Sequence, residues 1–174
     1  MGSNGSGDFH IGDRVVYPNH GVGIVEQIGT RTLGQQVEKY YLLNIKSSNL
    51  KVTVPFHSVA AVGLRPVVKN GEIQKILNYL ADGHGESAGD WKDRFKENSE
   101  KMRSGSIFHV AEVFKNLVYL SRVKPLSFRE KRMLDRARFL LISELSTVMN
   151  LAEMEIEDRI EKAVTKACGK VPVA

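Results

Sequence analysis

The sequence has one cysteine, one tryptophan and no long apolar run. Cys168 has no second cysteine with which to form an intramolecular disulfide or share a zinc site, which favours a reducing cytoplasm. No apolar stretch approaches the roughly 18–20 residues that a membrane span requires, so we expect no membrane insertion. The N-terminal residues lack the basic and apolar regions of a signal peptide, and we expect residues 1–8 to form a flexible leader outside the fold.

Recognisable catalytic motifs are also missing. The five histidines are far apart in the sequence, with no i, i+4 pair on a helix for zinc. Gly21 and Gly23 lack the third glycine and the following helix of a dinucleotide-binding loop. Ser104 and Ser106 flank a glycine but lack the spacing and preceding strand of a nucleophile elbow. We therefore expect a protein that is not an enzyme and needs neither metal nor cofactor.

Positive charge is concentrated in one stretch of the chain. The formal net charge is +5. Residues 91–138 contain thirteen Lys and Arg against six Asp and Glu, a net charge of +7, and the segments on either side carry a net negative charge. This distribution permits a polyanion partner without proving one.

The first part of the chain follows a β pattern. Segments rich in strand-forming residues predict strands at 14–17, 21–28, 37–45 and 50–54. Gly21 and Gly23 would permit a bulge or sharp bend, residues 30–34 would form a turn, and no helix is expected between the strands. Short strands joined by Gly, Pro, Asn and Ser turns favour a small antiparallel barrel over residues 9–66.

After Pro66 the apolar period becomes helical. Apolar side chains at 73, 76, 77 and 80 recur at i, i+3, i+4 and i+7, which predicts one helix. Asp90, Ser106, Ser127 and Asn150 are expected to cap four more, with Ser127 and Glu130 forming a capping box. We expect an α+β protein in which a compact α domain of about five helices occupies residues 67–170, followed by a tail at 171–174.

Trp91 is the first candidate functional residue. It follows a glycine-rich loop and starts a helix in which Lys92, Arg94 and Lys96 are basic. A large aromatic side chain often anchors a helix to a core. Proteins that distort DNA from the minor groove instead insert an apolar wedge beside cations that hold the phosphates. The residues alone leave both interpretations open.

The pair Lys131 and Arg132 is the second candidate. At the start of a long helix these side chains oppose the helix dipole, a small cost that contacts with phosphate would reverse. A solvated basic face is the alternative, and the residues alone leave both interpretations open.

Several motifs resemble the CarD/CdnL family of bacterial transcription regulators. Residues 11–23, Ile-Gly-Asp-Arg-Val-Val-Tyr-Pro-Asn-His-Gly-Val-Gly, are similar to its opening motif, which also occurs in the polymerase-interaction module of transcription-repair coupling factors. Further segments that fit the family are 39–43 with 50–55, 62–65 and 130–138. The resemblance covers roughly residues 9–165. A coupling factor would continue into helicase-like sequence, whereas this chain continues into a small helical domain.

The resemblance implies a Tudor-like, SH3-like β domain that binds the RNA polymerase β subunit, partly by pairing a strand edge. The family's interface positions carry over to Arg31, Leu33, Thr53 and Pro55. Some members have arginine where this chain has Thr53, so the contact is expected to be weaker or to take its charge from Lys51.

The resemblance also assigns the DNA contacts. The family's tryptophan carries over to Trp91, which would wedge into the minor groove at the upstream edge of the melted promoter. Basic positions expected to touch the DNA backbone match Arg94, Lys96, Lys131 and Arg132. The implied protein is a cytoplasmic, nucleoid-associated monomer that regulates initiation by stabilising the open complex, with little sequence-specific readout.

Two other functions compete with this one. A general nucleoid-type DNA-binding protein would bind any duplex in a salt-sensitive way without polymerase, with the β domain merely structural. A polymerase-bound protein adaptor would use its helical face for protein contacts, so that substitutions at Lys131 and Arg132 would not alter DNA association.

Overall fold

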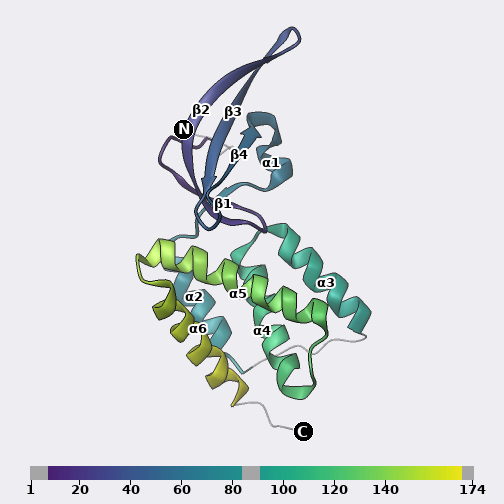
Figure 1. Ribbon diagram of the computed structural model, residues 1–174. Helices are drawn as coiled ribbons and strands as arrows, with labels where there is room; N and C mark the ends of the chain where they lie inside the picture. The colour runs from purple at the N-terminus through teal and green to yellow at the C-terminus, as the bar shows by residue number, and fades with distance from the viewer. Residues whose placement is uncertain (1–7, 84–90, 170–174) are drawn as a thin grey trace. The chain divides into compact units, whose positions relative to one another are not determined.

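The structure is a computed structural model that describes residues 8–83 and 91–169. The chain separates into two compact units, Met1–Val67 and Val68–Ala174 (Figure 1). The first contains an antiparallel sheet and the second contains helices, which confirms the predicted α+β class. The leader up to residue 7, the predicted cap Asp90 and the tail at 171–174 lie outside the described residues.

The described part of the β unit, from residue 8, forms a five-stranded antiparallel sheet. Its strands are ordered β4-β3-β2-β1-β5, and their bounds are β1 (Arg14–Tyr17), β2 (Gly21–Leu33), β3 (Gln36–Ile45), β4 (Leu50–Pro55) and β5 (Arg65–Pro66). A 3₁₀ turn, η1 (Phe56–Ser58), and a short helix, α1 (Val59–Val62), connect β4 to β5. No helix lies between the four predicted strands, as expected, whereas η1, α1 and the two-residue strand β5 that follow them were not predicted.

The hairpin of β2 and β3 extends beyond the other strands (Figure 1). Thr30–Leu33 belongs to β2, whereas the sequence predicted a turn there. The turn lies at Gly34, whose φ of 64° is a conformation that glycine adopts without a steric penalty. The bulge of β2 lies between Val25 and Gln27 and not at the glycines.

One face of the sheet carries the core of the β unit. Tyr41 and Leu43 of β3 point into it with Val54 of β4, and all three are almost fully buried. The hydroxyl of Tyr41 accepts a hydrogen bond from the backbone N–H of Phe9 at 3.1 Å. Because side chains alternate along a strand, the even-numbered residues of β3 from Tyr40 to Asn44 point to the opposite, outer face.

The described residues of the second unit form five helices, as predicted. They are α2 (Asn70–Ala81), α3 (Trp91–Ser104), α4 (Ile107–Val123), α5 (Phe128–Met149) and α6 (Glu153–Cys168). Helix α2 packs against α6, and both α3 and α5 pack against α4. The predicted apolar face of α2 supplies Ile73, Ile76 and Leu80 to the core, and Leu77 packs against it half-buried. The other helices supply Val110, Val113, Phe114, Leu117, Ala137, Leu141, Leu145, Ile156, Ile160 and Val164.

The helix caps follow the sequence only in part. Ser127 Oγ accepts from Glu130 N at 3.2 Å, and Ser127 N donates to Glu130 Oε2 at 2.8 Å, so the predicted capping box is confirmed. Ser106 stands at the start of α4 but makes no side-chain cap. Asn150 does not cap α6. It ends α5 in the left-handed conformation with a φ of 54°, and Ala152 precedes α6.

One lysine is buried inside the helical unit. Lys115 of α4 is 1% exposed, and its Nζ donates to the backbone carbonyl of Tyr79 at 2.6 Å, near the end of α2. The same Nζ lies 4.2 Å from the centroid of the Tyr79 ring. Burial lowers the pKa of Lys115 because the charged form loses hydration. Its hydrogen bond and ring contact offset part of that cost.

Candidate functional site

The strand register brings all five candidate polymerase-binding residues to one face of the sheet. On β4, Lys51 pairs with Asn44, Thr53 with Leu42 and Pro55 with Tyr40. On β2, Arg31 pairs with Glu38 and Leu33 with Gln36. Directly paired residues point to the same side, and the β3 partners are all even-numbered. The five side chains therefore share the outer face, opposite the core.

The bulge in β2 decides this arrangement. Before it, Val25 pairs with Leu43 and points into the core, and after it Ile28 pairs with Tyr41 on that same side. The side that odd-numbered residues of β2 occupy thus changes across the bulge. Without the extra residue, Arg31 and Leu33 would point to the core side of the sheet.

The outer face is charge-balanced and reaches an open edge. Arg31 Nε donates to Glu38 Oε2 at 2.7 Å, and Lys51 Nζ lies 3.3 Å from a carboxylate oxygen of Glu26. Thr53 is exposed beside these cations and carries no charge. Strand β4 pairs only with β3 among the described strands, so its other backbone edge is available to an added strand.

An aromatic ring covers a glycine on the same face. Gly29 pairs with Tyr40, and a Cβ added at Gly29 would stand 2.6 Å from both Cζ and Oη of that ring. The Arg31 guanidinium lies 5.8 Å from the ring centroid of Tyr40. Tyr40 thus fixes the surface beside the candidate residue Arg31.

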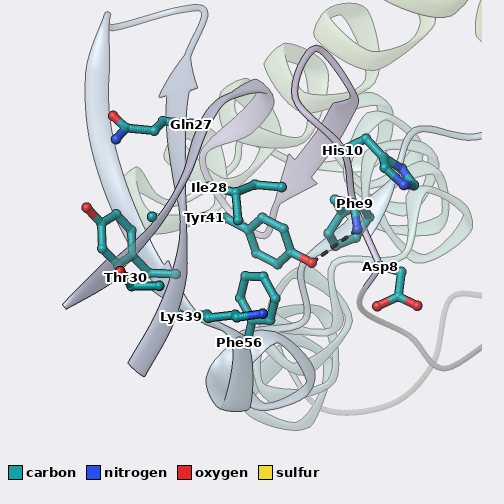
Figure 2. Close-up of a pocket in the computed structure, with 11 residues that line it drawn as sticks. Asp8, Phe9, His10, Gln27, Ile28, Thr30, Lys39, Tyr41 and Phe56 are labelled. Atoms are coloured by element: carbon teal, nitrogen blue, oxygen red, sulfur yellow. Dashed lines mark hydrogen bonds between the residues drawn. The ribbon is translucent and has the colours of Figure 1, made fainter. Parts of the chain in front are cut away.

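The opposite side of the hairpin holds a recess of about 800 Å³ (Figure 2). Phe9, Ile28, Tyr41 and Phe56 supply its apolar lining, and the rings of Tyr41 and Phe56 stack at 4.3 Å between centroids. Lys39 also lines the recess, whereas none of the five candidate residues does. Sequence reasoning did not find it, because its members are separated along the chain.

The candidate DNA-binding residues occupy two helices. Trp91 is the first residue of α3, and its side chain lies outside the description. Arg94 is half-buried and four residues from the buried Asn98, whereas Lys96 is exposed. At 100° per residue Arg94 and Lys96 point to different sides of α3, so the structure does not bring these two together.

Lys131 and Arg132 are exposed neighbours, the fourth and fifth residues of α5. Neither forms an ion pair with any residue in 8–83 or 91–169. The Arg132 guanidinium lies 5.8 Å from the ring centroid of Phe128, which is 74% exposed. No local pattern distinguishes Phe128, because an aromatic residue beside a helix cap is usually a packing residue.

The described residues contain neither a metal-binding group of three or more His, Cys, Asp or Glu nor a helix long and apolar enough to cross a membrane.

Comparison with known proteins matches both units. Residues 9–68 match the family model of the CarD-like/TRCF RID domain, and residues 75–161 match that of the CarD C-terminal domain. A protein of Bacillus subtilis (strain 168) described as "Putative transcription factor YdeB" is 34% identical over 149 residues, which cover 86% of this chain and 97% of that protein.

Proposed function

The chain belongs to the CarD family of transcription regulators, and from this premise we propose that it binds the RNA polymerase β subunit and promoter DNA together. The β unit binds polymerase, and the helical unit binds DNA near the upstream edge of the transcription bubble. The bound protein stabilises the open complex. No covalent chemistry is involved.

The observation that carries the proposal is the shared outer face of the sheet. Four residues that the family resemblance selects, together with Lys51, are spread over two strands and point the same way only because of the register and the bulge. They lie beside β4, whose edge can accept a strand from a partner, so backbone pairing supplies affinity and the side chains supply specificity. Because the charges of Arg31 and Lys51 are already paired with carboxylates, they fix the register of such a contact more than they increase its affinity.

The DNA half of the proposal has a thermodynamic mechanism. A protein that binds the melted promoter more tightly than the closed one shifts the equilibrium by that difference in affinity. Trp91, at the start of α3, inserts at the bubble edge and hinders reannealing, while Lys96, Lys131 and Arg132 contact phosphates. Arg94 contributes from its half-buried position. Attachment to polymerase raises the effective concentration, so weak and non-specific DNA affinity suffices.

Two substitutions on the same hairpin test the polymerase contact. Leu33→Asp places a charge on the outer face, where Leu33 is 55% exposed. Val37→Asp is the matched control, because Val37 is 72% exposed and pairs with Thr32 on the opposite side of the hairpin. Both should fold, since neither side chain is buried. Binding to purified RNA polymerase is measured by surface plasmon resonance.

Leu33→Asp is expected to weaken polymerase binding at least tenfold, since a charge in an apolar contact is left unpaired. Val37→Asp should bind like the wild type. Equal binding by all three proteins would exclude the outer face as the polymerase contact. A loss with Val37→Asp alone would move the contact to the side with the aromatic recess.

A further inference from the structure

The connection between α4 and α5 gathers cations that have no acidic partner among the described residues. We refer to residues 122–136 as the α4–α5 corner. All its Lys and Arg side chains are exposed, and none forms an ion pair with a residue that the structure describes: Arg122, Lys124, Arg129, Lys131, Arg132 and Arg136. Its two acidic residues are already engaged. Glu130 is buried in the capping box, and Asp135 lies 3.4 Å from Arg138.

This arrangement carries an electrostatic cost that no carboxylate of the described residues offsets. Lys101, Arg138 and Arg159 in the same unit each lie within 3.5 Å of a carboxylate. In the corner, by contrast, cations lie in the first two turns of α5, where the helix dipole disfavours positive charge. A bound polyanion would remove both the mutual repulsion and the unfavourable dipole interaction.

An exposed aromatic ring lies among these cations. Phe128 is the first residue of α5 and is 74% exposed, and Val123 at the end of α4 is 84% exposed. Phe128 shares one helix face with Lys131, Arg132 and Arg136, which follow it at i+3, i+4 and i+8. The capping box fixes the start of the helix, so the ring is held on the face opposite the core.

The chemistry of this surface fits DNA at the edge of a melted region. Phosphates match the cations, and a phenylalanine ring gains free energy by stacking on a nucleobase. Inside a closed duplex the base faces are already stacked on one another, whereas an unpaired base exposes a face. We propose that Phe128 stacks on an unpaired base while the corner's cations, including the unassigned Arg122 and Lys124, hold the flanking phosphates. This inference rests on the proposed DNA binding and adds a second aromatic contact, on a helix other than that of Trp91.

Fluorescence anisotropy of the full chain at low salt tests the proposal with two labelled DNAs of equal length and charge. One is fully paired, and the other ends in a fork of unpaired bases. The wild type should bind the fork more tightly. Phe128→Ala should lose about fivefold to 100-fold in affinity for the fork with little change for the duplex. Phe128→Tyr should retain the preference, and Val123→Ala is the matched exposed control that changes nothing.

Replacing both Arg122 and Lys124 by serine measures how much of the DNA affinity comes from phosphate contacts. It should weaken binding to both DNAs alike and lower the slope of log affinity against log salt by about one for each lost phosphate contact. A 2-aminopurine at the first unpaired position should be quenched by the wild type and by Phe128→Tyr but not by Phe128→Ala.

Three results would overturn the inference. In the first, the wild type binds the fork and the duplex with equal affinity. In the second, Phe128→Ala binds the fork as tightly as the wild type does. In the third, Phe128→Ala weakens binding to polymerase in the absence of DNA, which would make Phe128 a protein contact. In each case the effect of the wild type on open-complex lifetime remains a separate readout, so the proposed function can stand when this inference fails.

Discussion

Gly29→Ala should destabilise the β unit, although alanine usually stabilises a strand relative to glycine by about 0.5–1 kcal/mol. The reason is the ring of Tyr40, which lies over Gly29. An added Cβ would stand 2.6 Å from the ring, whereas ordinary contacts begin at 3.4 Å, so the ring must move by about 0.8 Å.

The size of the effect follows from what Tyr40 loses. Turning the ring away from its rotamer costs about 0.5–1.5 kcal/mol. Losing the contact with the Arg31 guanidinium costs about 0.5–1 kcal/mol more. After subtraction of the usual stabilisation by alanine, the free energy of unfolding should fall by about 1 kcal/mol. For a unit of this size it lowers Tm by about 4–8 °C.

Thermal and urea unfolding of a double-mutant cycle measure this coupling. In a Tyr40→Ala background the ring is absent, and Gly29→Ala should become neutral or stabilising. Gly71→Ala is the control, because nothing lies within 4 Å of a Cβ there and no loss of stability is expected. If Gly29→Ala is as stable as the wild type, or equally destabilising with and without the ring, the reasoning about Tyr40 is wrong.

Three further predictions concern the helical unit. Ser127→Ala removes the capping box and should lower the free energy of unfolding, measured in urea, by about 1 kcal/mol. An unchanged free energy would mean that the box does not stabilise the protein. Asn150→Ala should lose about 1 kcal/mol at the left-handed end of α5 whereas Asn150→Gly should not, and equal losses would contradict the conformational argument. The difference in free energy of unfolding between the wild type and Lys115→Met should grow in favour of the wild type as the pH rises. The rise is expected between the lowered pKa of Lys115 in the folded protein and its ordinary pKa of 10.5. There the native lysine has released a proton that the unfolded chain still holds; a difference that does not vary with pH would show that Lys115 keeps its ordinary pKa.

The helices were predictable because their signals are local. The 3.6-residue period of the apolar side chains and the capping box of Ser127 depend on neighbours within one or two turns. Asn150 was assigned to the wrong helix, because the same residue type suits the start of one helix and the left-handed end of another. The sequence alone does not separate these two roles.

The outer face of the sheet was not predictable from the residues. Arg31 and Leu33 point outward because of a bulge at Glu26, and a bulge has no strong sequence signal when no glycine marks it. Thr30–Leu33 was predicted as a turn, because its strand character depends on pairing with β3. Family resemblance selected Arg31, Leu33, Thr53 and Pro55, and Lys51 was added as a substitute charge. The register explains how the five can act together. The exposure of Phe128 depends on tertiary packing, which no local pattern reports.

The lifetime of the open complex tests the central claim most directly. It is measured on a promoter with the RNA polymerase holoenzyme from the same bacterium, with no factor, with the wild type and with Trp91→Ala. The account predicts that the wild type lengthens the lifetime and that Trp91→Ala binds polymerase but does not lengthen it. An unchanged lifetime with the wild type would contradict the account, and equal lengthening by both proteins would remove Trp91 from the mechanism.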